Sequence, residues 1–302
     1  MDRLDAMQLF TRIVETGSFT QAANSLNIPR ATATHAIKQL EERLSVRLLE
    51  RTTRKVRTTP DGQAYYQRCM QILDDLEEAE SALQNSAANP QGILRVDMHN
   101  SHAIHVVLPR IQEFRERYPR IELVLSSGDR LVDLLGEGID CVIRGGVPKD
   151  SSLIARKLAV VPEVLCASPA YIERFGKPSH PDELLQHQVV RFFNTPHEHN
   201  YPLEFIVDGQ ERSYDVPGWI SVNSSDNYVA SALSGCGIIQ LPRFPIEPLI
   251  QSGQLVELLP QWQSPGVQIH AMYPYHRQLS VRVRVFVDWV TSLYQEKFGP
   301  LR

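Results

Sequence analysis

Five side chains near the start of one helical stretch have the chemistry to contact an anionic groove. Residues 28–44 read IPRATATHAIKQLEERL, and the leading side chains are small and flanked by bases. Thr, His and Lys can bond base edges or phosphates, while Ala and Thr methyl groups suit a thymine methyl. Small leading side chains also let a helix enter the roughly 12 Å wide major groove of DNA. The alternative is an ordinary solvent-facing helix. The candidate contacts are Arg30, Ala31, Thr34, His35 and Lys38.

The residues around this stretch predict a helix-turn-helix. An apolar stripe ends at Gly17, where a helix can stop. Ser18 with Gln21 is a capping box that opens a second helix. Asn27 suits a left-handed turn, and Pro29 suits the start of the third helix. With 4-3-4 spacing, the inward positions expected in the third helix are Ala33, Ile37, Leu40 and Leu44.

Two further segments complete an N-terminal domain and add a helix after it. Residues 46–59, VRLLERTTRKVRTT, lose the helical period and are rich in Thr, Val and Arg, which favours a short β-hairpin, or wing. Thr59, Pro60 and Asp61 then supply a cap, a first-turn proline and a first-turn acid for a long helix. Its apolar positions form a heptad seam that predicts a dimer coiled coil, with packing onto the chain's own body as the alternative. The seam positions are Tyr65, Cys69, Ile72, Leu76, Ala79 and Leu83.

Beyond a linker at residues 84–92, the pattern changes to alternating strands and helices. ILRVDM, IELVLS and IDCVIRGG read as strands, with helices expected at 101–118 and 130–136 between them. This βαβαβ alternation predicts a mostly parallel sheet covered by helices. Similar units continue to the C-terminus as LVELL, VQIHAMYP and a final helix near 279–297.

Composition and charge limit the classes of protein that fit. The 302-residue chain has a net charge of −4, but residues 1–60 hold ten Lys and Arg against six Asp and Glu. A basic front on an acidic body suggests a polyanion partner for the front only. No apolar run approaches the roughly 18 residues of a membrane helix, and the charged N-terminus does not suit a signal peptide. We therefore expect a cytoplasmic protein with no membrane partner. The four cysteines form no CxxC pair and the histidines match no closed zinc spacing, so no metal or other cofactor is expected.

The order of several motifs resembles the LysR-type transcriptional regulators from end to end. The N-terminal resemblance lies in GSFTQAANSL, QLEERL and LLERTTRKVRTTPDG. The C-terminal resemblance lies in LPRIQEFRERYPRIEL, DLLGEGIDCVIRGG, LCASPAYIERFGKP and SALSGCGIIQLP. The chain departs from the family pattern at four positions. It has Ser45 where the family usually has Gly, and Thr34 where the family usually has Ser. It has His35 where the family often has Arg, and Leu49 where the family has Phe. The departures bear on base contacts rather than on the fold.

The resemblance implies an α/β fold class and a set of partners. It implies a winged helix-turn-helix at 1–59, a linker dimerisation helix and hinge at 60–91, and a two-lobed effector-binding domain at 92–302, similar to a periplasmic binding protein. Lobe I would span about 92–161 and 268–302, and lobe II about 162–267. Proteins of this kind assemble as dimers or tetramers, bind promoter DNA and act on RNA polymerase. Two recognition helices per dimer predict a pseudo-palindromic pair of half-sites in double-stranded DNA.

Further DNA contacts are expected outside the third helix. The first turn of the second helix offers amide groups and a positive dipole end to a phosphate, at Ser18, Phe19 and Thr20. The wing offers basic side chains for phosphate or minor-groove contacts, at Arg51, Arg54 and Lys55. Arg51 could equally be a structural residue inside the wing.

A ligand site is expected beyond the carboxyl ends of the parallel strands. Three loops lie there in lobe I, and two segments of lobe II would close the cleft over them. The expected effector is a small polar or aromatic organic acid, held by hydroxyl groups and a helix end. Arg144 could pair with that acid or could brace lobe I. The candidate effector contacts are Asn100, Ser101, His102, Ser127, Gly128, Arg144, Phe193, Ser224 and Ser225.

Three classes of function compete for this sequence. A ligand-responsive, DNA-binding transcriptional regulator fits the motifs best. A redox-sensing regulator would need a disulfide between two of the four cysteines. An enzyme, or a transport binding protein with an accessory N-terminal domain, is disfavoured. The sequence contains no nucleophile elbow, phosphate-binding glycine loop or metal quartet, and no signal peptide.

Overall fold

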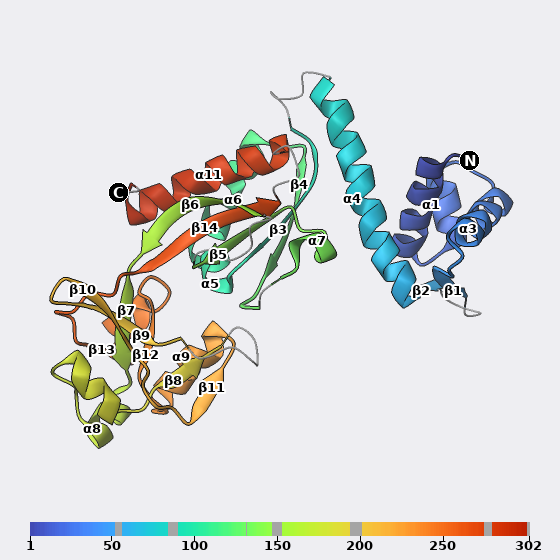
Figure 1. Ribbon diagram of the computed structural model, residues 1–302. Helices are drawn as coiled ribbons and strands as arrows, with labels where there is room; N and C mark the ends of the chain where they lie inside the picture. The colour runs from blue at the N-terminus through green and yellow to red at the C-terminus, as the bar shows by residue number, and fades with distance from the viewer. Residues whose placement is uncertain are drawn as a thin grey trace. The chain divides into compact units, whose positions relative to one another are not determined.

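The chain folds into two compact units, which we describe separately. The computed structural model describes residues 1–51, 56–83, 90–130, 132–146, 153–193, 201–274 and 280–300. The first unit holds Met1–Asn89 with Asp133–Ile139, and the second holds Pro90–Val132 with Asp140–Arg302. Figure 1 traces the elements from the N-terminal helices in blue to the C-terminal helix in red. Among the described residues, no helix is both long enough and apolar enough to cross a membrane.

The first unit begins with the predicted winged helix-turn-helix. Three helices come first, α1 (Arg3–Thr16), α2 (Phe19–Ser25) and α3 (Arg30–Leu44). The wing follows as β1 (Leu49–Arg51) and β2 (Val56–Thr58), which pair antiparallel. The predicted helix stop at Gly17 and the predicted left-handed turn at Asn27 are both confirmed, with φ 62° and φ 54°.

One apolar core holds the three helices together. Side chains from each helix are fully buried in it, including Phe10, Ala22 and Ile37. The prediction that Leu44 faces inward is wrong, because this side chain is 37% exposed. Ala36 is buried in its place. Leu44 is the last residue of α3. A helix of 3.6 residues per turn drifts away from a strict heptad, so the stripe at positions 33, 36, 37 and 40 faces the core instead.

The long helix α4 (Pro60–Leu83) begins at the predicted cap, where the Gly62 amide donates to Thr59 Oγ1 at 2.9 Å. Its first turns serve the core of the first unit: Cys69 is fully buried, and the Tyr65 ring lies 5.5 Å from that of Phe10. Cys69 is therefore unavailable to a dimer seam, whereas Tyr65 is only partly buried against this core. Ile72 and Leu76 are 43% and 37% exposed. The side chains of Ala79 and Leu83 lie outside the described residues.

The second unit contains a five-stranded sheet with the order β4-β3-β5-β14-β6. The strands are β3 (Gly92–Met98), β4 (Ile121–Ser127), β5 (Cys141–Gly145), β6 (Leu153–Val161) and β14 (Val267–Pro274). Strand β3 pairs parallel with β4 and β5, whereas β14 pairs antiparallel with β5 and β6. The sheet is thus less parallel than the alternation predicted. The C-terminal helix α11 (Val281–Phe298) shares one apolar core with this sheet (Figure 1).

The helix expected at 101–118 is an irregular helical run. It comprises α5 (Asn100–His102), a π-helical turn (Ala103–Val107), a 3-10 turn (Leu108–Arg110) and α6 (Ile111–Arg117). Pro109 accounts for the irregularity, because proline has no N–H and clashes with the carbonyl four residues earlier. That carbonyl, of His105, accepts a hydrogen bond from Lys297 Nζ at 2.9 Å instead. The helix expected at 130–136 is also shorter, at α7 (Leu134–Glu137).

A second set of strands lies between β6 and β14 in the chain. Two sheets, β12-β7-β13 and β11-β8, are joined by a bridge between Val189 and Ile238, and β9 and β10 form a hairpin. Strands β8 and β11 pair parallel. The strands are β7 (Glu163–Ala167), β8 (Val190–Phe192), β9 (Leu203–Val207), β10 (Gln210–Tyr214), β11 (Ile220–Val222), β12 (Ile239–Pro242) and β13 (Val256–Leu258). The helices are α8 (Pro169–Phe175), the 3-10 helix η4 (Pro181–Gln186), α9 (Ser225–Leu233) and α10 (Glu247–Gln251).

We call the five-stranded sheet with α11 lobe I, and the later strands with α8 to α10 lobe II. The chain passes from lobe I to lobe II between β6 and β7, and it returns between β13 and β14. The exact domain and lobe boundaries stay predictions.

Candidate functional site

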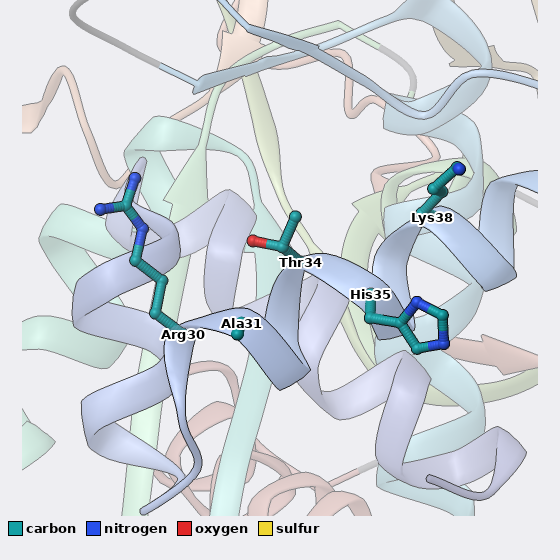
Figure 2. Close-up of a pocket in the computed structure, with 5 residues that line it drawn as sticks. All are labelled: Arg30, Ala31, Thr34, His35 and Lys38. Carbon is teal, nitrogen blue, oxygen red and sulfur yellow. The ribbon is translucent and has the colours of Figure 1, made fainter.

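The predicted contacts of α3 gather on one exposed surface of the first unit. Figure 2 shows Arg30 at one end of this surface, His35 and Lys38 at the other, and Ala31 with Thr34 between them. Together these five residues line one hollow, which we call the reading face. Thr34 is partly buried, and the other four are exposed. The small side chains therefore form the floor of the hollow, and the basic ones form its rim.

The start of α3 is left open by its own sequence. Its N-cap residue, Pro29, contributes no side-chain cap, and the first turn holds no acidic residue. The first amides and the positive end of the helix dipole are therefore available to an external anion. Lys38 and Glu42 lie 3.6 Å apart, but with both side chains more than 60% exposed their ion pair holds Lys38 only weakly.

The first turn of α2 is less accessible than its sequence predicts. The Gln21 amide donates to Ser18 Oγ at 3.3 Å, so this hydroxyl caps the helix from within. Phe19 is 8% exposed and packs into the core, because the helix turns this position toward α1 and α3. Thr20 is exposed. Of these three predicted contacts, only Thr20 presents its side chain fully to solvent.

The wing is tied to α3 by a residue that sequence reasoning missed. Glu41 Oε1 accepts hydrogen bonds from the amides of Leu48 and Leu49, at 2.8 and 3.1 Å. One carboxylate thus fixes the start of the wing against the helix that carries the reading face. Its position within the QLEERL motif was the available signal. The side chain of Arg51, and both Arg54 and Lys55, lie outside the described residues.

In the second unit, the predicted loops meet at the carboxyl ends of parallel strands. In lobe I, Ser127 Oγ lies 3.4 Å from Asn100 Oδ1, and Ser101 and Gly128 are their chain neighbours. In lobe II, the Phe193 amide donates to the Val222 carbonyl at 3.0 Å. This contact brings Phe193 to the same end of β8 and β11 as the two serines at the start of α9, Ser224 and Ser225.

An unpredicted carboxylate connects these two groups of residues. Asp129 Oδ2 accepts a hydrogen bond of 2.5 Å from the Ser225 amide in lobe II, and Oδ1 lies 2.7 Å from His99 Nδ1 in lobe I. The Asp129 side chain is only 6% exposed. Burial by itself would raise its pKa, but the bonds from His99 and Ser225 outweigh burial and hold the pKa of Asp129 below its usual value. Position 129 directly follows the predicted loop 126–128, which was the only signal for it in the sequence.

Two of the predicted effector contacts face inward. Arg144 is 4% exposed and forms an ion pair with Asp97, whose other oxygen accepts from Ser126 Oγ at 2.6 Å. This geometry fits the bracing alternative for Arg144. His102 is 3% exposed, and its ring stacks on Tyr294, with Nδ1 2.7 Å from the tyrosine oxygen. Burial lowers the pKa of His102 to about 3, so the ring is neutral and packed rather than available to a ligand.

Three of the four cysteines are buried, and the fourth, Cys236, is partly exposed. Cys69, Cys141 and Cys166 are buried free thiols, and burial raises the pKa of each, to about 11 for Cys69 and about 12 for Cys166. A raised pKa disfavours the reactive thiolate. Within the described ranges, no group of three or more His, Cys, Asp or Glu could hold a metal ion. Residues 197–199, HEH, lie outside those ranges.

Two family models cover most of the chain. Residues 4–63 match "Bacterial regulatory helix-turn-helix protein, lysR family", which spans the helices and wing that carry the reading face. Residues 87–295 match "LysR substrate binding domain", which spans both lobes and the residues around Asp129. The two matches therefore divide the candidate site into its two parts.

Curated relatives and solved structures agree with these matches. The chain is 41% identical to an uncharacterized HTH-type transcriptional regulator of Escherichia coli, over 98% of this chain and 99% of the relative. It is also 41% identical to an HTH-type transcriptional repressor of Pseudomonas aeruginosa, over 98% of this chain and 93% of the relative. The solved structure of CrgA, a LysR-type regulator from Neisseria meningitidis, aligns with a TM-score of 0.58 and 32% identity, covering 98% and 99% of the two chains. The chain therefore belongs to the LysR family of bacterial transcriptional regulators, with a helix-turn-helix DNA-binding part and an effector-binding part.

Proposed function

We propose that this regulator reads its DNA through the reading face of α3, and that a small organic acid bound between lobes I and II modulates its activity. One observation carries the DNA part: five side chains suited to base edges and phosphates line one exposed hollow at an uncapped helix start. Because it would act on chromosomal DNA, we place its action in the cytoplasm.

The roles within the reading face follow from position. Ala31 and Thr34 form the floor, so the helix can approach base edges without a long side chain holding it away. His35 is exposed beside them and can bond a base edge. Arg30 and Lys38 stand at the rim, where phosphates flank a groove. His35 should therefore contribute specificity, whereas the rim bases should contribute affinity for any sequence.

The test measures binding of His35→Ala to the protein's own upstream DNA and to a scrambled duplex of equal length. A lost base contact costs about 1–3 kcal/mol on the specific site, so binding there should fall roughly tenfold while scrambled DNA is little affected. Gln39→Ala, at an exposed position off the reading face, is the matched control. Equal losses on both duplexes would refute a base contact by His35.

The effector part is supported by the hydroxyl and amide groups that meet at the strand ends of both lobes, Asn100, Ser101, Ser127, Gly128, Phe193, Ser224 and Ser225. A panel of aliphatic and aromatic carboxylates should include one that raises the melting temperature of the full-length protein. The same acid should then change the DNase footprint on the upstream DNA. A stabilising acid that leaves every footprint unchanged would contradict an effector role.

We also propose that α4 pairs two copies of the chain, so that two reading faces contact a pseudo-palindromic site, in a dimer or a tetramer that acts on RNA polymerase. The exposed apolar side chains of Ile72 and Leu76 support this pairing. Leu76→Asp should dissociate the dimer, because it places a charge in an apolar seam. Ala64→Asp, exposed on the same helix outside the seam, should not. An unchanged sedimentation coefficient for Leu76→Asp would rule out this seam.

A further inference from the structure

We propose that Asp129 is an internal latch of the cleft: its carboxylate holds the loop after β4 in lobe I to the first amide of α9 in lobe II, and an effector carboxylate acts by taking its place. The inference rests on the effector function proposed above. It adds a named residue that the effector must displace.

The geometry of Asp129 is that of a fixed bridge between the lobes. Each of its two oxygens contacts a different lobe. Oδ2 accepts from the Ser225 amide of lobe II at 2.5 Å, and Oδ1 lies 2.7 Å from His99 Nδ1 of lobe I. The carboxylate is almost entirely buried, and the His99 side chain retains 24% exposure. A hydrogen bond from an amide to an ionised carboxylate is about twice as strong as a neutral one. The latch is therefore held firmly at its lobe II end.

Helix α9 depends on this carboxylate for its cap. Its N-cap residue, Ser224, makes no side-chain hydrogen bond to the helix. Asp129 instead places an anion on the first amide of the helix, from the other lobe and from 96 residues earlier in the chain. Breaking the contact between the lobes would leave the start of α9 uncapped, and a carboxylate of similar size could then bind there.

A second feature near Asp129 suits an incoming acid. The Nε atom of Arg144 is buried and has no hydrogen-bond partner among the described residues. Arg144 Nη2 donates to the carbonyl of Arg130, the chain neighbour of Asp129, at 3.3 Å. A buried cation with an unused donor favours a second anion in the same cluster. The occupant class that fits both features is a carboxylate, which is the group that Asp129 itself supplies.

The test uses hydrogen–deuterium exchange on the full-length protein. Asp129→Ala should speed exchange in the first turn of α9 roughly tenfold, because a charge-assisted bond is lost there. Sodium formate, added as the probe, should restore protection in this variant, since formate can occupy the vacated carboxylate position. Asp226→Ala, which removes an exposed acid from the same turn of α9, is the matched control. It should speed exchange only slightly, through the lost interaction with the helix dipole, and formate should not reverse that increase.

Each outcome decides the proposal. Unchanged exchange in Asp129→Ala, or equal formate protection in Asp226→Ala, would overturn the latch. If Asp129→Ala does not fold, Asp129→Asn keeps the shape and an acceptor oxygen, and it should give a smaller increase in exchange that formate does not reverse. If the first turn of α9 exchanges at the same rate in Asp129→Asn as in the wild-type protein, the proposal is also overturned. Footprinting with organic acids is a separate measurement, so a failed effector function and a failed latch are distinguishable.

Discussion

Helices α3 and α9 both begin without a side-chain cap, but the start of α3 is open to solvent and the start of α9 is bound by a carboxylate of the same chain. Neither N-cap residue, Pro29 nor Ser224, supplies a side-chain cap. The start of α3 carries no acid and lies beside the exposed reading face, whereas the start of α9 is bound by the Asp129 carboxylate. An uncapped helix end thus identifies a place for an anion, and the surrounding structure decides whether that anion is a partner or the protein itself.

The same contrast extends to the side chains around each helix end. Four of the five reading-face residues are exposed, and these include the three basic ones, Arg30, His35 and Lys38. Around the cleft, Asp97 and Arg144 are buried as an ion pair, and His102 is buried against Tyr294. The proposed DNA contacts are therefore accessible without rearrangement, whereas an acid bound in the proposed cleft would replace contacts that the chain makes with itself.

The largest effect should follow from closing the open end of α3. Ala31→Glu places an acid on the floor of the reading face, where it repels phosphate and fills the groove clearance, so DNA binding should fall roughly 100-fold. The same acid in the first turn should stabilise the helix by about 0.3–1 kcal/mol. Electrophoretic mobility shift and thermal unfolding measure the two effects. Gln39→Glu adds equal charge elsewhere on α3 and is the control; similar losses in both variants would contradict the clearance argument.

The burial of His102 near the cleft predicts that the stability of the protein depends on pH. The pKa of His102 is lowered to about 3 in the folded protein, against about 6.5 when unfolded. Below pH 6.5 the unfolded chain binds a proton at His102 that the folded one excludes, so the contribution of His102 to stability should fall by about 1.4 kcal/mol per pH unit as pH drops from 6.5 toward 3.

Chemical denaturation at several pH values measures this slope. His102→Gln retains an acceptor for the Tyr294 hydroxyl. Its unfolding free energy should depend less on pH between pH 6.5 and 4.5, by about 1.4 kcal/mol per pH unit. Identical slopes in the two proteins would show that His102 is not excluded from protonation.

A smaller effect is expected at the rim of the reading face. Lys38→Ala should weaken binding to all duplexes by about three- to tenfold and reduce the slope of log affinity against log salt by about one. Lys177→Ala removes the same charge from an exposed position in lobe II and serves as the control. A salt slope unchanged in Lys38→Ala would place this side chain away from the phosphates.

The smallest effect concerns the opposite ends of the two helices. Ser45 ends α3 at φ 55°, in the left-handed region, whereas Ser234 ends α9 at φ −78°. Ser45→Gly should therefore stabilise the protein by about 0.5–1 kcal/mol, because glycine adopts positive φ without strain. Ser234→Gly should destabilise it slightly, since there glycine only adds freedom to the unfolded chain. Changes of the same sign in both variants would contradict the backbone argument.

Local patterns were sufficient for the elements of the first unit. Gly17, Asn27 and Thr59 mark helix ends by their own backbone or side-chain chemistry, and the structure has each feature where it was expected. The same kind of reasoning failed for Leu44 and for Cys69. The heptad spacing that placed Leu44 inward and Cys69 in a dimer seam says which positions share a face, but not which neighbour that face meets.

The sequence by itself determined the family, the winged helix-turn-helix, the reading face and the loops at the strand ends, because these depend on residue types at short spacing. The tertiary structure decided which polar groups are paired within the chain. It buried His102 and Arg144, and it brought Asp129 to the start of α9 from the other lobe. Such pairings join residues far apart in the chain, and no local pattern records the distance between them.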